Sequence, residues 1–368
     1  MIEISQKPFK ELGIKAVVKP TRQCNLKCKY CYVGDNTENT KMDFQTLENT
    51  IVKLIEHNSS EKATSFAWHG GEPLLMGLDF FIKITDLQKQ YKQSHTILNS
   101  IQTNGTFLNQ DILDFCADTG FYISISLDGP SELHNTSRIF SETKGSFDLV
   151  MKAIYEMKSR SDVNGGVIAT ITRPTLERIT DFYAFFKEVG LDLKVSPLIH
   201  SGRAIENLGQ FSISPEEYGK FMISLFDIWF NENKPTFAIT NFRTLMRKIL
   251  ERVKVKEEIP YSPCIDSFVG IGPNGDVYPC GRYDNISEFK IGNINEDTIK
   301  KILSSPNRLK FYSKESECNN CQDYNVCIRC EHNAYMVNSP VDYYCGGYQK
   351  LINHVAQRVR KELEIEAH

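Results

Sequence analysis

The 368-residue chain lacks long apolar runs, a strong charge imbalance and internal repeats. No run reaches the ~18 apolar residues of a membrane-spanning helix, so no membrane is expected as a partner. The net charge of −3 gives no electrostatic reason to expect nucleic acid as a partner. The first residues, Met1 to Gln6, show neither the basic nor the apolar segment of a secretory signal. We therefore expect a cytoplasmic protein.

The chain is rich in cysteine for a protein without a recognisable export signal. It has eleven cysteines, and in a reducing compartment these indicate metal or redox chemistry rather than disulfides. One of them, Cys116, lies on the apolar side of a predicted helix and is expected in the core. The hydrophobic share of 41% is enough for one large core and a smaller satellite domain.

Short runs rich in β-branched and aromatic residues alternate with amphipathic stretches over the first 200 residues or so. The predicted strands are 14–18, 64–68, 97–102, 122–127, 167–172 and 193–198. The predicted helices are 43–56, 78–91, 110–118, 147–157 and 175–188. This alternation predicts an α/β fold in which helices cover a parallel sheet. In parallel barrels the chemistry gathers at the C-terminal ends of the strands.

Three cysteines, Cys24, Cys28 and Cys31, follow the first predicted strand with the spacing C-x3-C-x2-C. Three thiolates on one short loop suit a [4Fe–4S] cluster, and they leave one of its four irons free for another ligand. The alternative is zinc, which needs four protein ligands in a closed site and finds no histidine nearby. The spacing therefore favours an iron–sulfur cluster.

This cysteine stretch resembles the radical S-adenosylmethionine (SAM) superfamily, in which the free iron of a [4Fe–4S] cluster binds SAM. The resemblance implies reductive cleavage of SAM to a 5′-deoxyadenosyl radical. It also implies that Tyr30, the aromatic residue before the third cysteine, packs near the adenine. The six strand–helix units then imply a partial (β/α)6 barrel, as these enzymes have.

The segment from His69 to Pro73 follows the second predicted strand and matches the GGEP motif of the superfamily, with Gly70, Gly71 and Glu72. Glycine lets the backbone approach a ligand closely, and Glu72 or its neighbouring carbonyls would meet the SAM ammonium. The alternative is an ordinary Gly-Gly turn. His69 is either a packed histidine at the strand end or a residue that faces the substrate.

Polar residues also end the third and fourth predicted strands, in segments that resemble the peptide- and protein-modifying members of the superfamily. The resemblance places Gln102 and Asn104 among the SAM contacts, and Ser126 and Asp128 at the SAM ribose or carboxylate. Arg138 is the expected charge partner of a carboxylate. The alternative for Arg138 is a surface salt bridge.

Seven further cysteines lie in the last third of the chain, and their spacing resembles the SPASM extension, which binds two auxiliary [4Fe–4S] clusters. The family usually has C-x3-C at its last pair, whereas this chain has C-x2-C, so the ligation of Cys330 stays open. Spacing alone also allows a zinc-ribbon pair. Seven thiolates leave one auxiliary iron without a cysteine. The resemblance divides the cysteines into a nearer set, Cys264, Cys280 and Cys330, and an outer set, Cys318, Cys321, Cys327 and Cys345.

Three parts are therefore expected: a partial barrel over 1–202, a helical bridge over 203–259, and an auxiliary-cluster module with a closing helix over 260–368. Ser214 followed by Pro215 predicts a helix start in the bridge, with Ser214 as N-cap. The cysteine-rich module has many turn residues, so it is expected to have little core of its own and to depend on its metal for stability.

The resemblance to SPASM-type maturases covers nearly the whole chain. It implies an enzyme with three [4Fe–4S] clusters and SAM that oxidises a side chain of a peptide or protein. It also implies an electron donor such as flavodoxin or ferredoxin. The most similar groups are the anaerobic sulfatase-maturing enzymes, which convert Cys or Ser to formylglycine, and the enzymes that cross-link ribosomal peptides.

The residue after Cys280 bears on the choice between these groups. In the sulfatase maturases a catalytic Asp directly follows the second SPASM cysteine, whereas here Gly281 follows it and the next carboxylate is Asp284. Asp284 is thus the candidate catalytic base. We expect a ribosomal-peptide cross-link as the main activity and formylglycine formation as the alternative. A zinc-binding module without catalysis is the alternative of another class.

Overall fold

The computed structural model describes residues 12–34, 40–92, 94–232, 235–254, 264–309, 317–327 and 329–366. Within these ranges one sheet of nine strands has the order β11-β10-β9-β1-β2-β3-β4-β7-β8. The strands are β1 (Leu12–Val18), β2 (Ala63–Trp68), β3 (Ile97–Thr103), β4 (Tyr122–Ser126), β7 (Gly165–Ile171), β8 (Asp192–Pro197), β9 (Phe268–Ile271), β10 (Asp276–Tyr278) and β11 (Gly292–Asn293).

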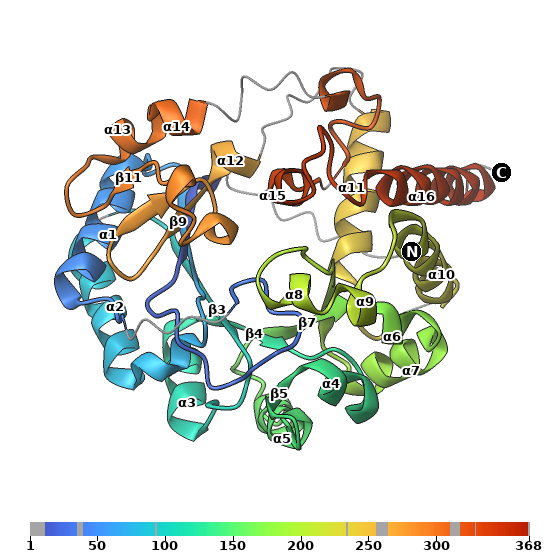
Figure 1. Ribbon diagram of the computed structural model, residues 1–368, viewed down its shortest axis with the longest axis horizontal. Coiled ribbons are helices and arrows are strands. Elements are labelled where there is room, and N and C mark those ends of the chain that lie inside the picture. Colours follow the sequence, from blue (N-terminus) through green and yellow to red (C-terminus); the bar gives the residue numbers. More distant parts are fainter. Residues whose placement is uncertain are drawn as a thin grey trace.

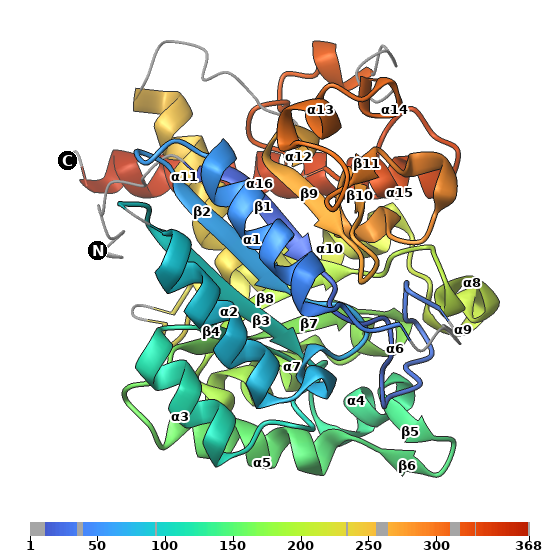
Figure 2. The ribbon, with the colours of Figure 1, turned by 90° about the vertical axis from the view of Figure 1, so that its left-hand side faces the viewer.

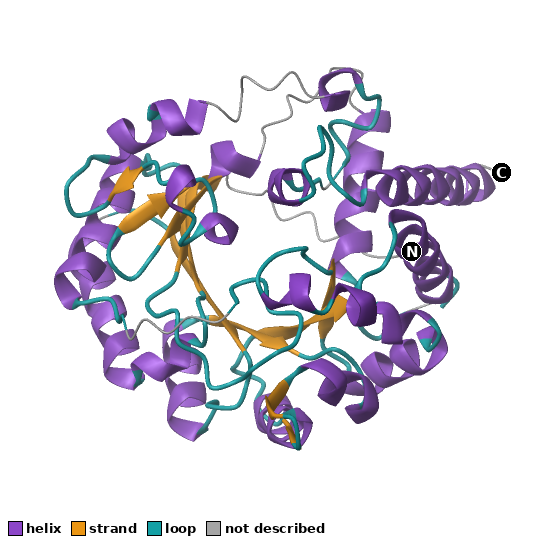
Figure 3. Cartoon of the chain, in the orientation of Figure 1, coloured by secondary structure: helices purple, strands orange, loops and turns teal. Residues whose placement is uncertain are grey.

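The six strands from β1 to β8 pair in parallel and form the predicted partial barrel. Figure 1 shows the sheet curving inside a ring of helices, and Figure 3 separates the two kinds of element by colour. The strands are built from β-branched and aromatic residues, and Phe66, Trp68, Ile101 and Ile123 are fully buried in the core. The predicted strands are confirmed, with their ends shifted by one or two residues.

The helices of the barrel cover the outer side of the sheet, and Figure 2 shows α1, α2 and α3 side by side over its strands. The predicted helix over 175–188 is two helices, because Arg178 leaves the helical conformation (φ −122°, ψ 34°). Cys116 is buried on α3, as predicted. A hairpin of β5 (Ile139–Ser141) and β6 (Lys144–Gly145) follows α4. The helices are α1 (Phe44–His57), α2 (Leu78–Tyr91), α3 (Gln110–Thr119), α4 (Ser131–Ser137), α5 (Phe147–Lys158), α6 (Arg173–Leu176) and α7 (Ile179–Val189).

The predicted bridge is helical where the structure describes it; residues 255–259 lie outside the described ranges. Ser214 caps α10 as predicted: its side chain accepts from the Glu217 backbone N–H at 3.1 Å, and the Glu217 carboxylate accepts from the Ser214 N–H at 2.7 Å. This reciprocal pair is a capping box that fixes the start of the helix. The helices are α8 (Arg203–Glu206), α9 (Leu208–Phe211), α10 (Pro215–Phe230) and α11 (Thr240–Lys254).

The C-terminal module shares its sheet with the barrel. Strand β9 pairs in parallel with β1, with Lys15 opposite Phe268 and Val18 opposite Ile271. Val277 of β10 belongs to the same buried core as the barrel strands. The module therefore has more apolar support than its composition indicated. Its helices are α12 (Cys264–Ser267), α13 (Ile299–Leu303), α14 (Pro306–Leu309), α15 (Glu331–Met336) and α16 (Cys345–Glu366), and the chain's 3-10 turns are η1 (Pro73–Met76), η2 (Gly281–Tyr283), η3 (Ser287–Phe289) and η4 (Glu317–Asn320).

The predicted closing helix is α16, which packs along α10 and α11. The division of the chain at residues 202 and 259 stays a prediction. Among the helices that the structure describes, none is long and apolar enough to cross a bilayer.

Candidate active site

The three-cysteine loop lies beyond the C-terminal end of β1 and is hydrogen-bonded to the end of α4 and the start of β5. The Lys27 N–H donates to the Ile139 carbonyl at 2.7 Å, and the Lys29 N–H donates to the Ser137 carbonyl at 2.9 Å. Burial raises the pKa of Cys28 to about 12, and the thiols of Cys31 and Cys24 add to this shift. Cys24 itself is exposed, and Cys31 acts on its pKa in the same direction. The three thiols are thus close neighbours, and metal binding would release their protons.

The GGEP segment supports the cysteine loop directly. The Gly71 N–H donates to the Thr21 carbonyl at 3.1 Å, and the Glu72 N–H donates to the Gln23 carbonyl at 2.8 Å. A Cβ at Gly70 would lie 2.2 Å from the Thr21 carbonyl oxygen, and Gly70 also has φ of +128°. Both conditions require glycine. The glycines therefore let this segment pack closely against the backbone of the cysteine loop, which an ordinary Gly-Gly turn would not do.

The Glu72 side chain is fully buried and bonded within the protein. Its Oε1 accepts from the Leu74 N–H at 3.0 Å and from the Thr103 hydroxyl at 2.8 Å, and its Oε2 accepts from the Asn104 N–H at 2.7 Å. Burial raises the pKa of Glu72 to about 7 although these hydrogen bonds oppose the shift. The carboxylate thus holds strand ends together. Of the two predicted contacts for the SAM ammonium, the geometry favours the carbonyls next to Glu72 over its carboxylate.

Tyr30, Asp128 and Arg138 form a buried polar cluster. Arg138 Nε donates to Asp128 Oδ2 at 2.8 Å, and the Tyr30 hydroxyl donates to the same oxygen. The Arg138 guanidinium also lies over the Tyr30 ring, 5.3 Å from its centroid. The Thr170 N–H donates to Asp128 Oδ1 at 2.9 Å. Asp128 is thus the carboxylate partner of Arg138 within the chain, and the surface salt bridge considered for Arg138 is wrong.

The remaining predicted SAM contacts lie at adjoining strand ends. Gln102 Nε2 donates to the Ser126 hydroxyl at 3.2 Å. Asn104 Nδ2 donates to Asn25 Oδ1 at 2.8 Å and reaches Cys24 Sγ at 3.7 Å. The structure therefore brings the second and third motifs next to the cysteine loop, as expected for the C-terminal edge of a parallel barrel.

His69 is packed at the end of β2. Its Nδ1 accepts from the Gly70 N–H at 2.7 Å, and its ring lies 6.4 Å from that of Tyr32. Burial and the charge of Lys19 lower the pKa of His69 to about 4, so the imidazole is neutral near pH 7. These contacts fit the packed histidine better than a residue that faces the substrate.

Asp284 is clamped between two buried cations. Arg22 donates to both carboxylate oxygens, at 2.8 and 3.0 Å, and Lys19 Nζ lies 3.4 Å from Oδ2. Burial would raise the pKa of Asp284, but Lys19 and Arg22 outweigh burial and lower it. A paired carboxylate with a lowered pKa is a weak base. The geometry therefore favours a structural role for Asp284 over the predicted catalytic one.

The nearer cysteine set lies beside that clamp. The Arg282 N–H donates to Cys280 Sγ at 3.4 Å, and Arg282 Nη1 donates to Cys330 Sγ at 2.6 Å. Burial raises the pKa of Cys280 to about 11, and the nearby thiol of Cys330 contributes to this shift. Cys330 is thus a neighbour of Cys280. Cys264 opens α12, and its side chain lies outside the described residues.

Gly281 is glycine for a steric reason. A Cβ at this position would lie 2.6 Å from Cγ1 of Val17 on β1. Any larger residue, aspartate included, would have to push the turn away from the strand. The close packing of η2 on β1 therefore explains why this chain has glycine where the maturases have aspartate.

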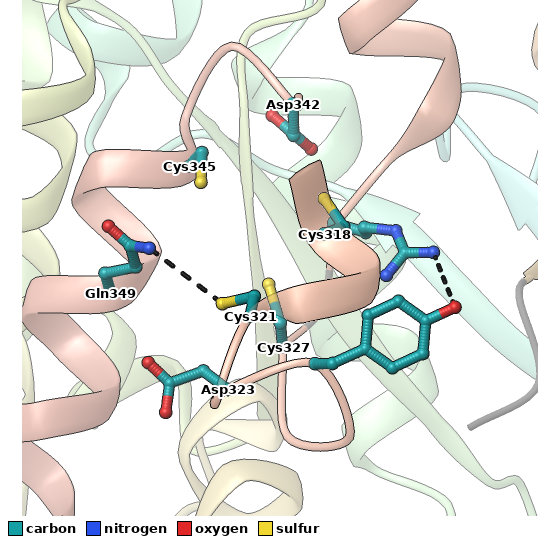
Figure 4. Close-up of a pocket in the computed structure, with 9 residues that line it drawn as sticks. Cys318, Cys321, Asp323, Cys327, Asp342, Cys345 and Gln349 are labelled. Carbon is teal, nitrogen blue, oxygen red and sulfur yellow. Dashed lines mark hydrogen bonds between the residues drawn. The ribbon is translucent and has the colours of Figure 1, made fainter. Parts of the chain in front are cut away.

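The outer cysteine set lines one pocket with about 340 Å³ of empty space, part of it open to solvent. Figure 4 shows the sulfurs of Cys318, Cys321, Cys327 and Cys345 around this space, with Gln349 Nε2 4.0 Å from Cys321 Sγ. Cys330 is not among the lining residues. The cysteines that line this pocket are the four that the family resemblance assigns to the outer cluster. Cys327 and Cys330 thus lie at different sites.

These thiol sets suit clusters better than single ions. Among the described residues, no three His, Cys, Asp or Glu side chains meet the geometry of a site for one metal ion. The ligands of a cubane bind separate irons and need not converge on one point. A partial barrel with a three-thiol loop at its strand ends and two further cysteine sets beyond it defines an iron–sulfur enzyme that acts with SAM.

Comparison with known proteins agrees with that class. Residues 18–186 match the family model described as "Radical SAM superfamily", and residues 264–331 match an iron–sulfur cluster-binding domain named SPASM. The chain is 31% identical to a serine-type anaerobic sulfatase-maturating enzyme of Bacteroides thetaiotaomicron, over 92% of this chain and 89% of the relative. It is 28% identical to a cysteine-type enzyme of Clostridium perfringens strain 13, over 94% and 97%.

A solved structure of native anSMEcpe with bound AdoMet and Cp18Cys peptide has a TM-score of 0.79 at 26% identity, and it covers 95% of this chain and 98% of that one. The chain belongs to the radical SAM superfamily and, within it, to the family of the anaerobic sulfatase-maturating enzymes. It is an enzyme of the class that uses SAM and [4Fe–4S] clusters to modify a peptide or protein.

Two residues of the site were not among the residues that the sequence motifs indicated. Lys19 is only 2% exposed, although lysine is rarely buried without a partner. His332 is 1% exposed and lies beside the cations Arg282 and Lys19. Neither belongs to a motif, and both depend on contacts between distant segments. A lysine directly after a buried strand was the one sign that could have identified Lys19.

Proposed function

We propose that this chain oxidises a cysteine or serine side chain of a protein substrate to formylglycine. The observation that carries the proposal is the likeness to sulfatase-maturating enzymes over more than nine-tenths of the chain, at a TM-score of 0.79 to a peptide-bound structure. The cross-link favoured by the sequence motifs has no comparable support, so the alternative becomes the main proposal.

In this proposal the cysteine loop and both auxiliary sets hold [4Fe–4S] clusters, divided as the family resemblance implies. When bound, the first cluster and SAM supply the deoxyadenosyl radical that removes a hydrogen atom from the substrate side chain. Polar groups at the strand ends bind and orient SAM, while the Glu72 carboxylate joins the end of β3 to the segment after β2. The SAM-binding set is Tyr30, Gly70, Gly71, Pro73, Gln102, Asn104, Ser126, Asp128 and Arg138.

Each member of the Tyr30–Asp128–Arg138 cluster is bonded within the protein, so the cluster is preorganised. A preorganised site of this kind loses little freedom when it binds. An external one-electron donor such as ferredoxin or flavodoxin completes the proposal.

A direct assay tests the activity. The chain is reconstituted anaerobically and given SAM, a reductant and a peptide with a sulfatase-type Cys-x-Pro-x-Arg motif or its serine counterpart. Mass spectrometry after hydrazide trapping is expected to find an aldehyde. The chain with Cys24, Cys28 and Cys31 all changed to Ala is the matched control and should give none. A parent chain that cleaves SAM but yields no aldehyde from either peptide would overturn the proposal.

The peptide cross-link remains a second candidate because of the contact at Gly281. Val17 leaves no room for a carboxylate beside Cys280, and Asp284 is held by Arg22 and Lys19. Both reactions release a proton, and in the sulfatase maturases that the sequence resembles a carboxylate directly after this cysteine accepts it from the thiol or hydroxyl. This chain has no carboxylate there. A product lighter by two hydrogens and without an aldehyde would favour the second candidate.

A further inference from the structure

The nearer auxiliary site is one ligand short. By the ligation proposed above it has the thiols of Cys264, Cys280 and Cys330, whereas a cubane has four irons to be bound. The eleven cysteines offer no replacement, since three belong to the loop, four to the outer set and Cys116 to the core. A fourth protein ligand must therefore be a residue of another type.

His332 has the properties of an unused ligand. It is 1% exposed, and neither Nδ1 nor Nε2 has a hydrogen-bond partner among the residues that the structure describes. A buried polar group without a partner is costly, and native structures nearly always satisfy such groups. An imidazole is also the commonest metal ligand among side chains. A metal bond would satisfy one nitrogen of this ring.

The position of His332 agrees with such a bond. It follows Cys330 by two residues, and its ring packs against Tyr283 with a centroid distance of 5.0 Å. Tyr283 ends the short turn η2, which begins directly after Cys280. The imidazole therefore contacts the segment of one proposed ligand while it belongs to the segment of another. Arg282 joins the two segments by reaching Cys330 Sγ.

The nearby carboxylates are already engaged. Asp342 accepts from the Cys330 N–H at 2.5 Å through Oδ2 and from the Tyr344 N–H at 2.8 Å through Oδ1. Asp284 is paired with Arg22 and Lys19. Binding iron through either carboxylate would break contacts that the fold uses, whereas His332 would break none.

We propose that His332 binds the iron of the nearer auxiliary cluster that the cysteines leave open. The cluster then has three thiolates and one neutral imidazole, and it carries one negative charge less than an all-cysteine cluster. Such a change raises the reduction potential, as histidine ligation does in Rieske centres. The proposal rests on the auxiliary ligation given above and not on the identity of the substrate.

Pulsed electron paramagnetic resonance tests the bond. The full chain is labelled with ¹⁵N-histidine, reconstituted, reduced and measured without SAM. The expected result is a ¹⁵N hyperfine coupling on one cluster signal that persists when Cys24, Cys28 and Cys31 are changed to Ala. The coupling should vanish in His332→Cys and remain in His200→Gln, a control whose ring bonds Ser212 at 3.1 Å. No coupling, or a coupling that survives His332→Cys, would overturn the proposal.

A redox titration gives an independent readout. His332→Cys offers a thiolate in place of the imidazole, so iron and sulfide contents should stay unchanged while the potential of one auxiliary cluster becomes more negative. An unmoved potential would contradict the bond. If the variant does not fold, the coupling in the parent chain decides alone. No substrate peptide is used, so failure here is distinct from failure of the formylglycine assay.

Discussion

Arg22 and Asp284 lie 262 residues apart in the chain and form a two-point ion pair, with N–O distances of 2.8 and 3.0 Å. Their side chains are 3% and 2% exposed. Arg22 stands two residues before the first cysteine of the loop, and Asp284 stands four residues after Cys280. The pair thus fixes the radical site and the nearer auxiliary site relative to each other.

Changing Asp284 to Asn should lower the free energy of unfolding by about 3–5 kcal/mol, because Arg22 and Lys19 would remain buried without a countercharge. Denaturant unfolding at pH 7 measures the loss. The folded pKa of Asp284 lies below its ordinary 3.8, so its stabilisation is complete above that pH and is lost as the pH falls through the folded value. The control Asp162→Asn removes a solvent-exposed ion pair and should change stability far less. Equal losses in the two variants would contradict the clamp.

The activities of two variants should distinguish a clamp from a base. If Asp284 only holds Arg22, then Asp284→Asn and Arg22→Gln should reduce product formation to a similar extent. If Asp284 is the base, Arg22→Gln should retain product, because losing the cation raises the carboxylate pKa toward that of a better base. Product yields under single-turnover conditions make the comparison, and we expect similar losses.

The chain with Cys24, Cys28 and Cys31 changed to Ala should form no 5′-deoxyadenosine, because the SAM-binding iron is lost. Iron and sulfide should each fall by about one third, as one of three cubanes disappears. Chromatography of the reduced reaction and metal analysis measure both effects. Undiminished SAM cleavage would refute the assignment of the loop.

Changing Cys280 to Ala should spare part of the SAM cleavage while product formation is lost. The loop that binds the first cluster is on another segment, whereas Cys280 belongs to the nearer auxiliary set. The matched control is Cys116→Ala, a core cysteine outside all three sets, which should retain both activities. Product at the parental level in the Cys280 variant would show that the nearer set is dispensable.

The stability of the chain should depend on pH through Glu72. Burial raises the folded pKa of this carboxyl from 4.5 to about 7, so between these values the folded state binds more protons than the unfolded state. Stability relative to a Glu72→Gln chain should therefore fall as the pH rises from 4.5 to 7 and level off above. Unfolding of both chains across this range measures the slope. A flat difference would mean that the bonds from Leu74 and Asn104 keep Glu72 ionised throughout.

Local patterns predicted much of the barrel. The strand over 97–102 was predicted from a short, mostly apolar run and the helix over 78–91 from its amphipathic pattern, and the structure has them as Ile97–Thr103 and Leu78–Tyr91. The cap at Ser214 was predictable because its signal lies within four residues. These elements need only short-range information.

Long-range pairing was not predictable in the same way. The C-x2-C spacing alone suggests that Cys327 and Cys330 act together, whereas the family resemblance assigns them to different sets. The structure places Cys327 in the outer pocket and Cys330 beside Cys280. The course of the backbone between Cys327 and Cys330 decides which site each thiol reaches, and the spacing in the sequence does not determine that course. The ion pair of Asp284 was also not predictable, because its partner Arg22 lies in a distant part of the sequence, and the catalytic role of Asp284 stays a prediction.

The pairing of β9 with β1 has a consequence for the way this chain matures. Strand β1 is the first to be synthesised, but its second neighbour exists only after the ribosome has passed Ile271. Until then one edge of β1 is exposed, and such edges invite wrong partners. Contacts between distant segments also slow folding. A newly made barrel is thus incomplete on its β1 side, and its first strand and the C-terminal module reach their final form together.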